Sequence, residues 1–288
     1  MSFASLGLSE ALVRAIEAAG YTQPTPVQQR AIPAALQGRD LMVAAQTGTG
    51  KTGGFALPIL ERLFPNGHPD REHRHGPKQP RVLVLTPTRE LAAQVEESVR
   101  LYSQHTRLRS MVMFGGVNIN PQFHALRKPL DILVATPGRL LDLVNQNAVS
   151  LRQVEVLVLD EADKLLELGF QEELQYILNL LPSKRQNLFL SATRPQSMVA
   201  LAQALLHDPL EIHIEGQAPQ PAEILQRAIY TDVAKRTQLL KHLLKEEHLK
   251  QVLVFVATQH SSGMVAAKLR VAGIAAEPFH GQLSQGKR

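Results

Sequence analysis

Short apolar runs alternate with amphipathic segments along the first 214 residues. The apolar runs predict strands at residues 41–45, 81–85, 109–113, 131–135, 154–159, 187–190 and 210–214. Helical spacing of apolar positions predicts helices at residues 5–19, 29–37, 55–63, 90–102, 121–128, 139–146, 170–180 and 196–206, the second of them kinked near Pro33. Nearly continuous apolar strands that alternate with helices are typical of a parallel sheet with helices on both faces. The predicted fold class is therefore α/β with a mainly parallel sheet.

The same alternation starts again after residue 214. Residues 215–222 contain Gly216, Pro219 and Pro221, which is typical of an interdomain linker. Beyond them the pattern predicts strands at 224–230 and 251–256, helices at 235–245 and 261–272, and an extended segment at 274–280. We therefore expect a first domain at residues 1–214 and a partial second domain at residues 223–288.

The strongest chemical signal is LMVAAQTGTGKT at residues 41–52, a strand followed by a glycine-containing loop and a helix start. Glycines allow backbone N–H groups to approach phosphates, and a helix N-terminus carries partial positive charge. Lys51 can reach the β- and γ-phosphates, and the Thr52 hydroxyl can ligate Mg²⁺. The phosphate loop itself consists of Gln46, Thr47, Gly48, Thr49 and Gly50. The pattern G-x-x-x-x-G-K-[ST] is met except at its first position, where Ala45 replaces Gly, and the alternative is a glycine-rich loop before an ordinary helix.

The acidic string DEAD at residues 160–163 is the second signal. A carboxylate at the end of a buried strand beside a phosphate loop can hold Mg²⁺, which fits Asp160. Glu161 can orient or deprotonate the water that attacks the γ-phosphate, whereas Asp163 is better placed to bond neighbouring motifs. An isolated DEAD string also fits an acidic helix N-terminus, but its pairing with Lys51 and Thr52 favours the nucleotide site.

Polar motifs follow six predicted strands. They occupy residues 46–52, 87–91, 115–116, 136–139, 160–163 and 191–193. Ligands of open parallel sheets bind beyond the carboxyl ends of the strands, so we expect these motifs on one edge of the sheet.

The segment GYTQPTPVQ at residues 20–28 precedes the first strand and contains two prolines that make a stiff, extended turn. The amide of Gln28 complements the N6 and N7 edge of adenine, and Tyr21 or Phe3 can stack near a base. Taken singly, Gln28 fits a surface or capping role better.

Composition narrows the class of protein. The 288 residues are 44% apolar and 20% charged, contain no cysteine and carry a net charge of +5. With no apolar run near ~20 residues and no signal peptide, we expect a soluble protein of a reducing, cytoplasmic compartment without disulfides. This net positive charge is consistent with a polyanion partner, and it is equally consistent with a role in solubility alone. His68, His73 and His75 lie in a polar segment that fits a solvated insertion better than a metal or RNA site.

Taken in order, these strings resemble the DEAD-box RNA helicases of superfamily 2, and most closely the bacterial RhlE-type group. The resemblance is carried by GYTQPTPVQ, AQTGTGKT, PTREL, GG, TPGR, DEAD and SAT between Phe3 and Thr193. It continues through Phe279-His280-Gly281 and Gln285-x-x-Arg288, so it covers essentially the whole chain.

This resemblance implies RecA-like domains, ATP and Mg²⁺ as cofactors, and RNA bound through its backbone without sequence preference. It implies adenine recognition by Phe3, Tyr21, Thr25 and Gln28, and catalysis by Lys51, Asp160 and Glu161, with Thr52 and Asp160 as metal ligands. Ser191 and Thr193, bridging toward Asp163, would couple hydrolysis to RNA engagement. RNA contacts are implied for Pro87, Thr88, Arg89, Gly115, Gly116, Thr136, Gly138 and Arg139, and in the second domain for His280, Gly281, Gln285 and Arg288.

The sequence departs from the family pattern in two places. Arg194 follows SAT where an aromatic residue is usual, and we expect little effect. The 288 residues also lack the family's ATDVAARGLD-like and HRIGRTGR-like strings, which supply arginine fingers, so we expect a truncated protein of impaired activity. The function we expect is RNA-stimulated ATP hydrolysis coupled to local duplex unwinding. The alternatives are a non-catalytic ATP- and RNA-binding module and a DNA-directed helicase.

Overall fold

The computed structural model describes residues 2–65, 77–214, 225–247, 249–284 and 286–288. The chain divides into two compact units, Met1–Ala218 and Pro219–Arg288. No helix in the described ranges is both long enough and apolar enough to cross a lipid bilayer.

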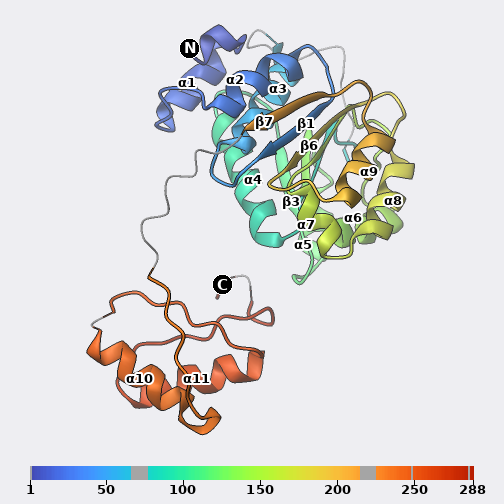
Figure 1. Ribbon diagram of the computed structural model, residues 1–288. Helices are drawn as coiled ribbons and strands as arrows, with labels where there is room; N and C mark the ends of the chain where they lie inside the picture. Colours follow the sequence, from blue (N-terminus) through green and yellow to red (C-terminus); the bar gives the residue numbers. More distant parts are fainter. Residues whose placement is uncertain (1, 66–76, 215–224, 248, 285) are drawn as a thin grey trace. The chain divides into compact units, whose positions relative to one another are not determined.

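The first unit alternates strands with helices (Figure 1). Its strands are β1 (Leu41–Ala45), β2 (Val82–Leu85), β3 (Ser110–Met113), β4 (Ile132–Ala135), β5 (Val156–Leu159), β6 (Gln186–Ser191) and β7 (Leu210–Ile214). Its helices are η1 (Ala4–Leu6), α1 (Glu10–Ala18), α2 (Pro26–Leu36), α3 (Lys51–Leu63), α4 (Arg89–Tyr102), α5 (Asn120–Ala125), α6 (Pro137–Asn145), α7 (Ala162–Glu167), α8 (Gln171–Leu180) and α9 (Gln196–Leu205).

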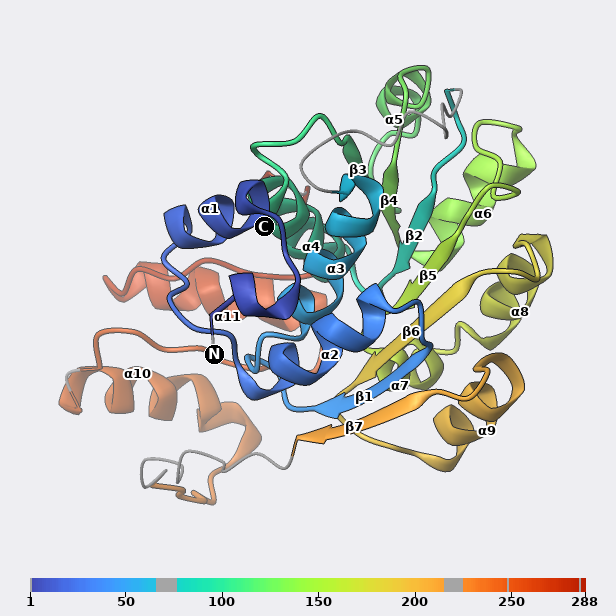
Figure 2. The same cartoon turned by 90° about the horizontal axis from the view of Figure 1, so that it is seen from above.

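All seven strands form one parallel sheet in the order β3-β4-β2-β5-β6-β1-β7. Alternate strand residues point to opposite faces, so each face has its own apolar core. Val43, Val84 and Val158 face the core that α1 to α4 cover, whereas Leu83, Leu85 and Leu157 face the core under α6 to α9. Figure 2 shows these two helical layers on either side of the strands. The α/β class with a parallel sheet covered on both faces is therefore confirmed.

Several helices begin or divide where the sequence pattern did not place them. The helix predicted at 5–19 is divided at Gly7, which has a φ of 91° that favours glycine. The helix α2 begins earlier than predicted because Thr25 and Gln28 form a capping box, and it continues through Pro33. The short helix α7 was not predicted, since its six residues give too little periodicity to detect.

The second unit contains η3 (Val233–Lys235), α10 (Arg236–Glu246) and α11 (Gln259–Val271). The prediction of strands at 224–230 and 251–256 is wrong, because the described residues of this unit form no β-ladder. A strand is stabilised by a paired neighbour and by burial of its faces, and here Leu253 and Phe255 expose 75% and 88% of their surface. Ala266 and Leu269 are the buried apolar residues that this unit shows within its described ranges.

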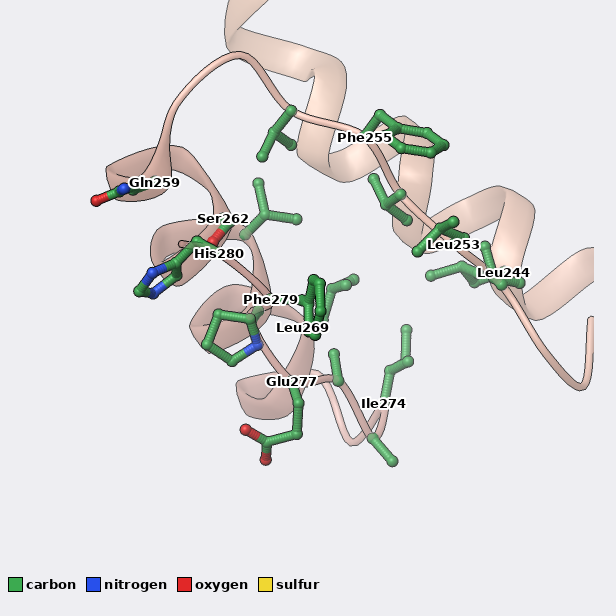
Figure 3. Close-up of a pocket in the computed structure, with 18 of the residues that line it drawn as sticks. Leu244, Leu253, Phe255, Gln259, Ser262, Leu269, Ile274, Glu277, Phe279 and His280 are labelled. Carbon is green, nitrogen blue, oxygen red and sulfur yellow. The ribbon is translucent and has the colours of Figure 1, made fainter. Parts of the chain in front are cut away.

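A cavity of about 530 Å³ lies between the extended segments and α11 of this unit. Figure 3 shows Leu253 and Phe255 on one side of it, and Leu269 and Phe279 on the other. Its lining is largely apolar, so the cavity marks the space that a packed core would fill.

Candidate nucleotide and RNA site

The loop at residues 46–50 connects β1 directly to the first residue of α3, Lys51. Gly48 and Gly50 have φ values of 81° and 87°, which side chains rarely adopt. A Cβ atom on Gly50 would lie 2.7 Å from Gln28 Nε2, and one on Gly53 would also lie 2.7 Å from it. Gly53 was not predicted as a site residue, and only its place after the GKT string could have indicated it. These glycines allow the loop and α3 to pack closely against the start of α2.

Gln28 joins the predicted adenine-binding segment to the phosphate loop. Its side chain is buried, Nε2 donates to Gly50 O at 3.1 Å, and Oε1 accepts from Thr25 N at 3.0 Å. One N–H of Nε2 and one lone pair of Oε1 are left for a base. An adenine bound by Gln28 would therefore form hydrogen bonds with the same side-chain amide that contacts the phosphate loop.

The two aromatic candidates differ in exposure. Phe3 exposes 4% of its surface and belongs to the apolar core, so its ring anchors the N-terminal segment and shows little face to a ligand. Tyr21 exposes 44%, and its ring meets Tyr102 edge-on with 6.2 Å between centroids. Tyr21 can therefore still offer a face to a base, and its contact with Tyr102 at the end of α4 was not predicted from the sequence.

Lys51 lies in the middle of the charged part of the site. Its ammonium group is buried and donates to Ala45 O at the end of β1. Burial lowers the pKa of Lys51, although the nearby carboxylates of Asp160, Glu161 and Asp163 act in the opposite direction. These interactions place the positive head group close to the DEAD string.

Asp160 directly follows β5, and Thr52 lies in the first turn of α3, beyond the loop that follows β1. Only β6 separates β1 from β5, so their carboxyl ends lie about 10 Å apart at the usual strand spacing. Burial raises the pKa of Asp160 to about 6, and Lys51 opposes this effect. A buried carboxylate and a hydroxyl are the hard oxygen ligands that Mg²⁺ prefers, so the residue types present fit this ion. No cluster of three or more His, Cys, Asp or Glu side chains suited to a metal occurs in the described ranges, so waters or phosphates would complete the shell.

Glu161 has a backbone conformation that is unusual for a residue with a side chain. Its φ of 50° lies in the left-handed region, and its N–H donates to Asp160 Oδ1 at 3.0 Å. Such strain is frequent at functional sites and is retained where the surrounding fold fixes it.

Asp163 connects the DEAD string to the SAT string. Its Oδ2 accepts from Thr193 Oγ1 at 2.6 Å and from Thr193 N at 3.0 Å, and Ser191 Oγ donates to Thr193 O. Burial alone would raise the pKa of Asp163, but the hydrogen bonds from Thr193 and Ser191 hold it below its usual value. The predicted bridge between these two strings is thus present in the geometry.

The candidate RNA-binding residues of the first unit gather beyond β2, β3 and β4. Arg89 begins α4, which Thr88 caps by accepting from Leu91 N at 3.2 Å, and Pro87 before it is buried. A Cβ atom on Gly116 would lie 2.1 Å from an Arg89 guanidinium nitrogen, so Arg89 covers the Gly115-Gly116 turn.

Arg139 is held against the same region from α6, which begins after Thr136 and includes Gly138. Its Nη2 donates to Val117 O at 2.9 Å, and its Nε lies 3.6 Å from Asp142 Oδ2. Nε and Nη1 are buried and have no hydrogen-bond partner among the described residues. The Val117 carbonyl was not identified from the sequence, because a backbone acceptor has no side-chain signature.

The other four candidates belong to the second unit. Arg288 lies 5.3 Å from the centre of the Phe279 ring, and His280 and Gly281 precede it on the same stretch. Gln285 lies outside the described residues. Their relation to the site of the first unit stays a prediction.

The glycine loop, the buried lysine and the acidic strand end together define a P-loop nucleotide-binding domain of the α/β class. A family model described as DEAD/DEAH box helicase matches residues 25–201, and the chain belongs to this family.

Curated relatives agree with this assignment. The DEAD-box ATP-dependent RNA helicase CshA of Bacillus cereus is 37% identical over 287 residues, which cover 100% of this chain and 53% of the relative. The ATP-dependent rRNA helicase rrp3 of Sclerotinia sclerotiorum is 41% identical, with 100% of this chain and 58% of the relative covered. The chain thus spans about half the length of the curated relatives it matches.

A solved structure has the same fold. A crystal structure of a DEAD box protein from the hyperthermophile Methanococcus jannaschii matches with a TM-score of 0.67 and 34% identity, covering 99% of this chain and 74% of that one.

Proposed function

We propose that this chain carries the ATP-binding and part of the RNA-binding machinery of an ATP-dependent RNA helicase, of the RhlE type by its motifs. The observation that carries the proposal is the meeting of Lys51, Asp160 and the Asp163–Thr193 bridge at one edge of the sheet. The proposal includes a cytoplasmic location, where both ATP and RNA occur.

The proposed chemistry follows from the residues of the phosphate loop. Its backbone N–H groups and Lys51 would hold the triphosphate. Thr52 and Asp160 would hold Mg²⁺, which supplies positive charge beside the phosphates when it is bound. Glu161 orients the attacking water and accepts its proton. Lys51, now bonded to Ala45 O, would exchange this acceptor for phosphate oxygens when ATP binds.

The proposed RNA contacts use the backbone of the ligand. Arg89 and Arg139 offer guanidinium groups, and the Gly115-Gly116 turn and Thr136 offer backbone and hydroxyl donors, which suits sequence-independent binding. The Asp163–Thr193 bridge would transmit the state of the nucleotide site to the loop after β6. The second unit would add His280, Gly281, Gln285 and Arg288.

The binding step is tested with Lys51→Ala. Removing the ammonium group deletes charge-assisted hydrogen bonds to two phosphates, so the Kd for a fluorescent ATP analogue should rise by about 100-fold. Titration of the 288-residue chain in Mg²⁺ buffer measures this, and circular dichroism confirms that the variant is folded. Unchanged affinity would contradict the proposed site.

The hydrolysis step is tested with Glu161→Gln in a version of the chain that also carries the later family motifs. The variant should lose RNA-stimulated ATP hydrolysis and keep RNA binding, because the amide holds a water but accepts no proton. Full turnover by the variant would exclude Glu161 as the base.

The same assay separates the alternative functions. If the 288 residues form a non-catalytic module, they bind ATP without RNA-stimulated turnover, and the extended version restores it. Stronger stimulation by DNA than by RNA would instead favour a DNA-directed helicase.

A further inference from the structure

Five exposed cationic side chains surround the amino-terminal end of the edge strand β3. They are Arg100 at the end of α4, Arg107 and Arg109 before β3, and Arg127 and Lys128 after α5, and together they form the basic face. None of the five forms an ion pair within the described ranges, whereas Arg81, Arg139 and Arg194 each pair with a carboxylate. An unpaired cation is free to bind an external anion.

A hollow of about 540 Å³ opens in the middle of the basic face. Arg100, Arg109 and Lys128 line it together with Ser103 and Ser110. The two hydroxyl groups already donate to Arg100 O and to Glu96 Oε1, so the free donors of the hollow are the three cations. Three cations around one concavity fit the oxygens of a phosphate group.

The acidic groups around the basic face leave it positive. Glu96 accepts the Ser110 hydroxyl, Asp131 Oδ2 accepts from Arg109 N at 2.8 Å, and Glu97 is the remaining exposed carboxylate nearby on α4. Five cations therefore oppose three carboxylates, two of which are already hydrogen-bonded.

The basic face and the candidate RNA site share the same two elements. The strand β3 leads from Arg109 to the Gly115-Gly116 turn, and α4 leads from Arg89 to Arg100. Arg89 and Arg100 are eleven positions apart on α4, which is about 16 Å at 1.5 Å per residue and the rise of roughly five stacked nucleotides at 3.4 Å each. A nucleic acid longer than this can reach both surfaces, which favours RNA over an acidic peptide as the ligand.

We propose that the basic face is a second, nucleotide-independent surface that binds phosphates of the RNA flanking the strand-end site. This proposal rests on the proposed function, because it assumes that RNA is the ligand of this chain. Its contacts are electrostatic and independent of base sequence, so they would lengthen the RNA footprint and increase the salt dependence of binding.

The experiment compares two triple variants of the 288-residue chain. Arg100→Gln, Arg109→Gln and Lys128→Gln together neutralise the hollow, and Arg14→Gln, Arg152→Gln and Lys184→Gln together are the matched control at exposed positions elsewhere. Both triples remove three positive charges. Fluorescence anisotropy measures the Kd for oligouridylates of 6 and 20 nucleotides over a series of salt concentrations. The shorter RNA is about as long as the distance between the strand-end site and the basic face, and the longer RNA extends well beyond it.

The hollow triple should bind the longer RNA about tenfold more weakly at low salt, with a salt slope reduced by about 2, as expected for three lost contacts to a single strand. Its affinity for the shorter RNA and for Mg–ADP should stay within twofold of the unmodified chain, and the control triple should resemble that chain for all three ligands. Equal losses in both triples, or an unchanged affinity of the hollow triple for the longer RNA, would overturn the proposal.

Two further results separate this proposal from the proposed function. Arg89→Gln should weaken binding of the shorter RNA as well as of the longer one. Unchanged binding of both RNAs by that variant would count against the strand-end site alone. If an oligoglutamate of matched charge displaces the longer RNA from the unmodified chain as well as unlabelled RNA does, the face binds an acidic protein segment, and the proposal is wrong.

Discussion

At the scale of single residues, the bond between Asp163 and Thr193 decides how the DEAD and SAT strings are held together. The hydrogen bonds lower the pKa of Asp163, so its ionised form is favoured in the folded protein. A lowered pKa contributes stability that is present above the unfolded pKa, near 3.8, and is lost as the pH falls through the folded value. The contribution is therefore complete at neutral pH.

We predict that Asp163→Asn lowers the free energy of unfolding by about 1–3 kcal/mol at pH 7, because the amide replaces a charged acceptor of several bonds. The difference should begin to shrink as the pH falls below about 4, because Asp163 of the unfolded state then takes up a proton while the folded state keeps it ionised. Urea unfolding between pH 3.5 and 7.5 measures this difference. Glu172→Gln, at an exposed position in the first turn of α8, is the control and should change little at any pH.

The partner of this bond provides an independent check. Thr193→Val removes the hydroxyl donor and keeps the shape of the side chain. In a double-mutant cycle with Asp163→Asn, the two changes should couple by about 1 kcal/mol, since they remove the same interaction. Strictly additive effects would show that the bridge contributes nothing to stability.

At the scale of elements, the close packing of α3 on α2 fixes the position of the phosphate loop. A Cβ atom on Gly53 would lie 2.7 Å from Gln28 Nε2, whereas one on Gly54 would lie 3.6 Å from Ala31 Cβ. Gln28 cannot move without losing its bond to Gly50 O, because its side chain is buried. The two adjacent glycines therefore form a matched pair for mutation.

We predict that Gly53→Ala weakens binding of Mg–ADP by about tenfold, the cost of one hydrogen bond, as Gln28 is displaced from the loop. Gly54→Ala should leave binding unchanged and stabilise α3 by up to about 1 kcal/mol through helix propensity. In a Gln28→Ala background, Gly53→Ala should have no further effect on affinity. Isothermal titration of the four variants tests this, and an additive loss in the double variant would contradict the mechanism.

The sequence patterns predicted the sheet well, for a physical reason. Runs such as VLVL in β2 and β5 are buried on both faces, and short runs of this kind are typical of parallel strands. The motifs at the strand ends could likewise be grouped, because parallel strands end at one edge.

Contacts set by packing could not be predicted. Three such features depend on how the helices pack on the sheet. They are the contact of Arg89 with the Gly116 turn, the hydrogen bond from Arg139 to the carbonyl of Val117, and the burial of the Phe3 ring. The two missing strands of the second unit show the same limit, because an apolar run at 251–256 predicts a strand but not the neighbour that it needs.

At the scale of the whole molecule, the two units differ in how much apolar surface they bury. The first has two continuous cores, one on each side of the sheet. In the second, Leu225, Tyr230 and Phe255 each expose more than four fifths of their surface. A unit with so little buried apolar area opens readily, so its amides should exchange with solvent far faster than those of the central strands.

The nucleotide provides a way to separate the two units by experiment. Because the proposed site lies entirely in residues of the first unit, Mg–ADP should stabilise that unit and leave the second unchanged. At 100 times its Kd, a ligand that binds only the folded state adds about 2.7 kcal/mol. Hydrogen exchange should therefore slow by about 100-fold in β1, β5 and β6, and stay the same in residues 225–247 and 251–256. With Lys51→Ala the effect on the sheet should disappear, and equal protection of both units would mean that the nucleotide also contacts residues beyond 218.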